Sequence, residues 1–252
     1  MVGPAIVAVG WVAMSDTVQL FVTCLVNSLY PNVGKATVAL LERAGYQVEF
    51  PLDQTCCGQP AFNGGFEDEA RAMTEQTIDV LDETEGPIIV PSGSCAAMIV
   101  HHSPDLVAAD PEYGPKARRV AGRTRELTQF LVDDAGIDVG QATCGNSVAT
   151  YHASCHGLRW LEVLEQPKHL LADAGVERVE MAGEDECCGF GGLFSIKMPE
   201  VSTAMMDTKI SNIEASGADV VVGVDVSCLM HIGGGLKRQG SQITTKHIAE
   251  IL

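Results

Sequence analysis

The hydrophobic pattern alternates short apolar runs with amphipathic stretches along most of the chain. Runs bounded by polar or glycine-rich positions predict buried strands at 18–23, 47–50, 88–90, 148–154, 178–181 and 219–223. Apolar residues at helical spacing predict helices at 33–43, 66–83, 163–174 and 199–216, with further helices at 116–125 and 127–135 in the connection between the two halves. This alternation predicts an α/β fold in which parallel strands are flanked by helices.

The same pattern occurs twice. Cys24 and Cys56 are 32 positions apart, and so are Cys155 and Cys187. The first motif, Cys-x31-Cys-Cys-Gly-x36-Cys, is followed by a second, Cys-x31-Cys-Cys-Gly-x38-Cys. We therefore expect two tandem homologous halves, at 15–143 and 144–252, each with a small parallel sheet flanked by helices. A pseudo-twofold axis should relate them.

The first thirteen residues are apolar but too short to span a bilayer, and they lack a basic leader. Met14 follows directly, so we interpret it as the natural start and residues 1–14 as a mis-called or disordered extension. A signal anchor is the alternative interpretation. No direct insertion into a membrane is expected.

Composition narrows the function classes. The chain has 252 residues, of which 46% are hydrophobic, so it can bury a sizeable core. Its formal charge of −17 argues against binding to nucleic acid or to an anionic membrane surface. Nine cysteines form an odd number without a secretory leader, which argues against a disulfide framework and for metal binding in the cytoplasm.

Eight of the nine cysteines fall into the duplicated motif. Four follow strands or form adjacent pairs in each half, so they should meet at the carboxyl ends of the parallel strands: Cys24, Cys56, Cys57, Cys95, Cys155, Cys187, Cys188 and Cys228. Sulfur ligands favour an iron–sulfur cluster or zinc. Their scatter over roughly 70 positions favours a redox site over a zinc ribbon. Inert buried thiols are the alternative, which the duplication makes the weaker interpretation.

Three histidines accompany the cysteines. His152 and His156 flank Cys155, where they could donate hydrogen bonds to cluster sulfur, bind metal, move protons or simply pack. His231 comes three residues after Cys228 and could supply an additional nitrogen ligand to the metal.

Glycines follow both cysteine pairs and are expected around the cluster. Gly58 and Gly189 close the two pairs. The glycine-rich segments 189–192 and 233–235 could bring backbone amides close enough to donate hydrogen bonds to the cluster sulfurs. Neither segment fits a nucleotide-binding motif. Cys144 is interpreted as an ordinary thiol, and the adjacent pair 101–102 as surface histidines. No catalytic residue can be assigned.

The duplicated motif resembles the cysteine-rich CCG domain found in the heterodisulfide reductase B chain, in the glycolate oxidase iron–sulfur protein and in the C chain of anaerobic glycerol-3-phosphate dehydrogenase. A free-standing chain with two copies is most similar to the lactate utilisation protein A family. The stretches that carry this likeness are 20–26, 32–38, 56–61, 91–95 and 187–192. The resemblance covers nearly the whole chain from Val18.

The resemblance implies an iron–sulfur oxidoreductase subunit in a cytoplasmic system that oxidises L-lactate to pyruvate. It implies one or two clusters of the [4Fe–4S] type on the eight cysteines. The partners that it implies are the two other proteins of a lactate utilisation system, a ferredoxin-like iron–sulfur protein B and a protein C. In the heterodisulfide reductase branch, five cysteines per motif hold a non-cubane cluster. Here Met98 and His231 occupy the fifth positions, so that cluster is not expected, and zinc could occupy one half.

Two alternatives remain from the sequence. One is a thiol or disulfide reductase of the heterodisulfide type, which needs an open site between the two halves. The other is a non-enzymatic assembly protein stabilised by zinc. The site of the substrate, the electron acceptor and the stoichiometry of the assembly are not determined by the sequence.

Overall fold

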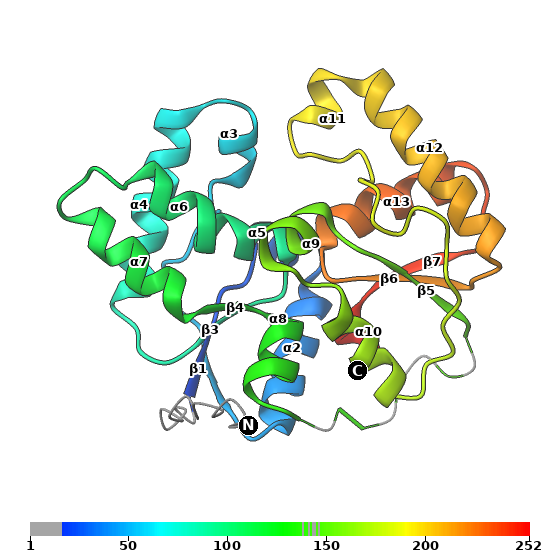
Figure 1. Ribbon diagram of the computed structural model, residues 1–252, viewed down its shortest axis with the longest axis horizontal. Helices are drawn as coiled ribbons and strands as arrows, with labels where there is room; N and C mark the ends of the chain where they lie inside the picture. Colours follow the sequence, from blue (N-terminus) through cyan, green and yellow to red (C-terminus); the bar gives the residue numbers. More distant parts are fainter. Residues whose placement is uncertain (1–16, 138, 141, 143–144, 146) are drawn as a thin grey trace, which may run out of the picture.

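The computed structural model of the protein describes residues 17–137, 139, 140, 142, 145 and 147–252. The predictions for residues 1–14, including the start at Met14, and for Cys144 lie outside the described residues. Within the described part, two parallel sheets stand side by side, and helices cover them (Figure 1). The predicted α/β class is confirmed.

The first sheet has four parallel strands in the order β2-β1-β3-β4. Their bounds are β1 Thr17–Leu20, β2 Gln47–Glu49, β3 Ile88–Val90 and β4 Thr124–Glu126. Parallel neighbours require crossover helices, and the amphipathic stretches between the strands provide them. β4 was not predicted, because the sequence TRE lacks the apolar run of a buried strand.

The second sheet repeats this order with β5 Ala149–His152, β6 Val220–Gly223 and β7 Thr244–His247, all parallel. At its outer edge, the strand predicted at 178–181 is reduced to a single parallel bridge between Ala149 and Arg178. That bridge takes the place that β2 has in the first sheet. β7, like β4, is polar and was not predicted.

Helices connect the strands in both halves. In the first half they are α1 Cys24–Leu29, α2 Pro31–Arg43, α3 Gln59–Asn63, α4 Glu67–Asp82, α5 Gly93–Ala97, the π-helical η1 Met98–His102, α6 Ser103–Leu106, α7 Tyr113–Arg123, α8 Leu127–Gln129 and the π-helical η2 Phe130–Asp134. In the second half they are α9 Cys155–Leu161, α10 Glu165–Asp173, α11 Phe194–Lys197, α12 Pro199–Ser216, α13 Val226–Arg238 and the 3-10 turn η3 Ile248–Glu250.

The two halves interlock. The segments after the last strand of each sheet cross to the other half: α8 and η2 pack on α10, and η3 packs on α2. Arg43, at the end of α2, donates a hydrogen bond to the carbonyl of Leu252 at 2.6 Å and so holds residue 252 against the first half. One continuous hydrophobic core therefore contains strand residues from both sheets, such as Ile89 and Val222. The halves are joined by buried apolar surface.

At the centre of the molecule, α5 of the first half packs against α9 of the second (Figure 1). Gly93 and Gly157 lie at the contact; a β-carbon on Gly93 would come within 3.0 Å of the Gly157 Cα. This close approach brings the carboxyl ends of both sheets toward each other, and the segments that carry cysteines with them.

Candidate metal-binding site

All eight cysteines of the duplicated motif line one cavity of about 300 Å³ between the two halves. Cys24 and Cys155 begin α1 and α9, each directly after its strand, while Cys95 and Cys228 lie in the first turns of α5 and α13. The adjacent pairs come from the loops that precede α3 and α11. The structure thus brings together residues that are up to 204 positions apart, from Cys24 to Cys228.

The first sulfur set consists of Cys24, Cys56, Cys57 and Cys95. The sulfurs of Cys24 and Cys56 lie 3.8 Å apart, a contact without a disulfide bond. The hydrogen bond donated by the Cys24 thiol lowers the pKa of Cys56 to about 2 and raises that of Cys24. Cys57 is buried, and its hydrogen bonds to Cys56 and Cys95 raise its pKa.

The second sulfur set consists of Cys155, Cys187, Cys188 and Cys228, and it repeats this pattern. The hydrogen bond from Cys155 lowers the pKa of Cys187 to about 2 and raises that of Cys155. Cys188, like Cys57, is buried and has a raised pKa because it hydrogen-bonds to Cys187 and Cys228. In each half, one cysteine of the adjacent pair is half-buried and has a lowered pKa, and the other is buried and has a raised pKa.

The glycine that closes each cysteine pair has a conformation and a position that exclude other residues. Gly58 and Gly189 have φ values of +88° and +89°. A β-carbon on Gly58 would meet the Ala70 carbonyl at 3.1 Å, and one on Gly189 would meet the Ser202 carbonyl at 2.6 Å. The turn thus packs directly on α4 or α12, and the Gly189 amide donates to the Cys187 sulfur at 3.4 Å.

Each sulfur set fits a soft metal centre. The sulfurs of each set contact one another in a row, from Cys24 through the adjacent pair to Cys95 and from Cys155 through the adjacent pair to Cys228. Ionising one of them raises the pKa of others, as Cys95 does for Cys24 and Cys228 does for Cys155. Four thiolates cannot share such a site without a cation, whereas an iron–sulfur cluster or a zinc ion both requires and stabilises them. The gathered cysteines are therefore compatible with metal or iron–sulfur binding.

Comparison with known proteins agrees with this geometry. The model of the cysteine-rich CCG domain matches residues 18–100 and 149–233, one match in each half. Lactate utilization protein A of Shouchella clausii is 47% identical over 236 residues, which cover 93% of this chain and 98% of that protein. Its namesake in Bacillus subtilis is 44% identical with the same coverage.

The chain belongs to the lactate utilization protein A family. Among solved structures, a hypothetical protein from Helicobacter pylori has the same overall fold, with a TM-score of 0.62 at 11% identity. That alignment covers 93% of this chain and 47% of the other, so it shows the fold alone.

In this member of the family, the histidines have distinct places. His156 lines the cavity, with its Nδ1 3.5 Å from the Cys155 sulfur, and burial lowers its pKa. His231 lies on α13 beside a neighbouring surface hollow, with its Nε2 3.4 Å from the hydroxyl of Ser202. His231 is thus absent from the lining of the cysteine cavity, and its ligand role stays a prediction.

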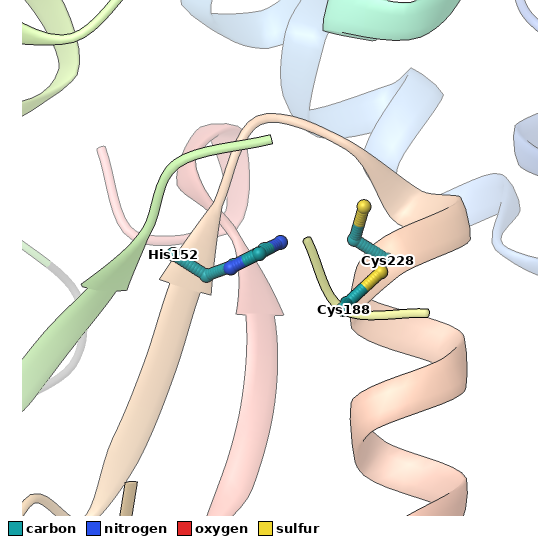
Figure 2. A group of neighbouring side chains, drawn as sticks. All are labelled: His152, Cys188 and Cys228. Atoms are coloured by element: carbon teal, nitrogen blue, oxygen red, sulfur yellow. The ribbon is translucent and has the colours of Figure 1, made fainter. Parts of the chain in front are cut away.

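His152 is more deeply buried than His156 and does not line the cavity. Its imidazole projects from the end of β5 toward the cysteines of the second sulfur set (Figure 2). The closest donor atoms of His152, Cys188 and Cys228 all lie within 4.8 Å of one another. The sequence placed this histidine near the cysteines, but it could not show that the side chain lies behind them and not in the cavity.

Two predictions about other residues are wrong. His102 is buried and not on the surface, because its ring stacks on Phe62 at a centroid distance of 4.6 Å. The glycine-rich segment 233–235 lies inside α13, where Gly235 lets the helix approach Ile210 and Gly233 lets it approach Thr245. Those glycines serve helix packing, whereas Gly191 and Gly192 line the cavity as expected.

Sequence reasoning missed Asp225. This buried carboxylate is the helix cap of α13 and accepts hydrogen bonds from the amide and hydroxyl of Ser227. It also accepts from the Ser94 amide at 2.8 Å and the Ser92 hydroxyl at 3.1 Å in the first half. It therefore joins the starts of α5 and α13 within the lining of the cavity. A signal was present, since Asp225 occupies the repeat position of Ser92, offset by 133.

Among the described residues, no helix is both long and apolar enough to cross a membrane.

Proposed function

We propose that this protein is an iron–sulfur electron-transfer subunit in the oxidation of L-lactate to pyruvate in the cytoplasm. The observation that carries the proposal is the meeting of two four-cysteine sets around one cavity. The names of its relatives, which describe lactate utilization, supply the pathway.

In this proposal, each sulfur set holds one cluster of the [4Fe–4S] type, with zinc in one half as the alternative. Such clusters accept and release single electrons when bound. Oxidation of one lactate to pyruvate releases two electrons and two protons. Two centres in one chain can therefore take up both electrons of one turnover, which gives the duplication a chemical purpose.

The chain's own residues prepare the two sites. Each adjacent pair supplies one half-buried sulfur with a lowered pKa and one buried sulfur, and the glycine amide of the turn donates to the half-buried one. Phe21 and Met98 are buried in the same hydrophobic core as Cys57 and Cys95, so apolar packing limits access of water to the first set from that side. We place the lactate site on a partner, because none of the described residues that line the cavity between the sets is an arginine.

The proposed partners are the ferredoxin-like iron–sulfur protein B and the protein C of the same lactate utilisation system. The cavity reaches the surface at Ile196, whose side chain lines it and is 74% exposed. Met198 and Val201 are also exposed large apolar residues at the start of α12 next to it. Exposed apolar side chains at the mouth of a redox site suit a contact with an electron-transfer partner.

The test combines metal analysis with growth. Protein purified without oxygen should contain iron and acid-labile sulfide, and after reduction it should give the paramagnetic signal of a cluster. A deletion strain should lose growth on L-lactate and regain it with the wild-type gene, but not with C57S or C188S. Stoichiometric zinc without iron, or unimpaired growth of the deletion strain in the absence of another lactate dehydrogenase, would refute the proposal.

A second candidate is a thiol or disulfide reductase. It is favoured by the cavity itself, which lies between the two sulfur sets and has room for a small molecule. In that reaction, a disulfide would take up two electrons and two protons and give two thiols. Turnover of small disulfides by the reduced protein, with no effect of lactate on its clusters, would favour this candidate over the first.

A further inference from the structure

The side chain of His152 is buried at the end of β5. It is 1% exposed, and neither of its ring nitrogens has a partner among the described residues. A buried polar group without a partner is unfavourable, so such a side chain is retained where something else satisfies it. Its ring points at Cys188 and Cys228 (Figure 2).

The first half has no such group at the equivalent position. The repeat offset of 131 pairs His152 with Phe21, and the strand registers agree, because Gln19 faces Ile88 as Thr150 faces Val221. Phe21 is fully buried in the hydrophobic core, where it needs no partner. The same position in the fold is thus apolar behind the first sulfur set and polar behind the second.

The donor atoms are spaced for one metal. Ligand atoms that surround one ion at about 2.0–2.3 Å lie within about 4.6 Å of one another. The 4.8 Å limit on the atoms of His152, Cys188 and Cys228 is close to this value. A neutral imidazole has one ring nitrogen with a free lone pair, which is the donor through which histidine binds metals.

We propose that His152 supplies a nitrogen ligand to the metal centre of the second sulfur set, which makes that centre a mixed histidine–cysteine site while the first is bound by thiolates alone. The inference rests on the proposed metal-binding role of the sulfur sets. In this site the neutral nitrogen takes the coordination position of one of the four thiolates; that cysteine stays a protonated thiol, so the negative charge around the metal is smaller and the reduction potential is higher. The second centre should therefore be the one reduced first.

The test detects nitrogen bound to the metal of the full-length protein. Chain labelled with 15N-histidine is purified without oxygen and reduced, and pulsed paramagnetic resonance measures the nitrogen coupling at iron. X-ray absorption spectroscopy at the edge of each metal present counts its nitrogen and sulfur ligands. It therefore also detects a nitrogen ligand if the second half contains zinc. We expect strong histidine coupling or a nitrogen ligand in the wild type, and loss of it in H152F, which copies Phe21.

H231M is the matched control, because it copies Met98 of the first half in the same way and should keep the nitrogen signal. If H152F does not accumulate, H152C keeps a soft donor in place and should replace nitrogen by sulfur. A wild-type metal shell without nitrogen, a signal that persists in H152F or H152C, or a signal lost in H231M overturns the proposal.

The outcome is separable from that for the function. Zinc bound through His152 without any iron would support this ligand and refute electron transfer. Iron clusters without nitrogen would refute this ligand and leave electron transfer standing. In a redox titration of iron-containing protein, H152F should also lower the potential of one centre and leave the other unchanged, whereas a side chain that only fills space would shift neither.

Discussion

The two halves share a scaffold, but they differ in the polarity of what surrounds their sulfur sets. Phe21, Thr77 and Ser92 of the first half correspond to His152, Lys209 and Asp225 of the second, when the offsets of 131, 132 and 133 are followed along the repeat. The offset of 132 in the long helices follows from the packing of Gly58 on Ala70 and of Gly189 on Ser202.

This difference has an electrostatic consequence. Lys209 is buried, and its ammonium donates to the carbonyl of Gly183; its charge lies near Cys188 and Cys228, and burial lowers its pKa. A buried cation and an imidazole lie near the second sulfur set. The aligned residues of the first half, Thr77 and Phe21, carry no charge, so the two sets have different electrostatic surroundings. The two halves therefore share the same cysteines but differ in the charged and polar side chains close to them.

The largest expected effect comes from replacing the adjacent cysteines of one sulfur set at a time. The double variants C56S/C57S and C187S/C188S should each lose the metal of their own half and keep that of the other, so about half of the bound metal remains. Metal and sulfide analysis of each purified variant checks this. Loss of all metal in either variant would show instead that the two sets hold one shared centre.

The next effect compares the two glycines of the cysteine turns. An alanine at either position must take a positive φ, which costs roughly 1–2 kcal/mol. At Gly189 the new β-carbon would also press on the Ser202 carbonyl at 2.6 Å, closer than the 3.1 Å at Gly58. G189A should therefore cost about 2–4 kcal/mol, more than G58A, and lower the melting temperature by roughly 5–15 °C.

Thermal unfolding of both variants at matched metal content, monitored by circular dichroism, measures this difference in melting temperature. G58A serves as the control for the shared cost of a positive φ. Equal melting temperatures for G58A and G189A would mean that α12 moves away without cost, and the closer packing of the second turn would have no energetic weight.

A third comparison concerns the last strand of each sheet. Glu126 pairs with Val90, and His247 pairs with Gly223 at the matching register, so an acid and a base occupy equivalent buried positions. Each caps the element that follows: Glu126 accepts from the Thr128 amide, and His247 from the Ala249 amide. Burial raises the pKa of Glu126 to about 7 and lowers that of His247 to about 4.

These shifts predict opposite pH dependences. Between about pH 4.5 and 7 the folded chain holds a proton on Glu126 that the unfolded chain has lost, so this residue costs stability as the pH rises. His247 costs stability as the pH falls from 6.5 to about 4, because the unfolded chain then binds the proton first. E126Q should remove the first cost, roughly 3 kcal/mol at most, and gain on the wild type as the pH rises to about 7.

Melting temperatures of wild type and E126Q between about pH 5 and pH 8 check this expectation. The advantage of E126Q should grow with pH and level off above about pH 7. A constant difference in melting temperature over the whole range would show that Glu126 does not titrate in this window. The H247Q variant should instead change the melting temperature on the acid side, between about pH 4 and 6.5.

Much of the fold and of the candidate site could be predicted from the sequence, because apolar strands and repeated cysteines produce regular spacings along the chain. The eight cysteines, the parallel sheets and the meeting of their carboxyl ends all followed from spacing. β4 and β7 did not, because their sequences are polar and they pair through the backbone at the end of the sheet. Asp225 and the depth of His152 depend on contacts between residues that are far apart in the chain, which no local pattern records.

The smallest expected effect lies at the caps of α1 and α9, directly before Cys24 and Cys155. The Thr23 hydroxyl accepts from the Val26 amide at 3.5 Å, a long hydrogen bond, whereas Ser154 makes no cap bond and its buried hydroxyl has no partner among the described residues. T23A should cost about 0.5–1 kcal/mol. S154A should be neutral or slightly stabilising, because it removes an unsatisfied hydroxyl. Melting temperatures of the two metal-matched variants decide: if S154A proves as costly as T23A, the Ser154 hydroxyl has a partner that the second centre provides, and the two halves differ there as well.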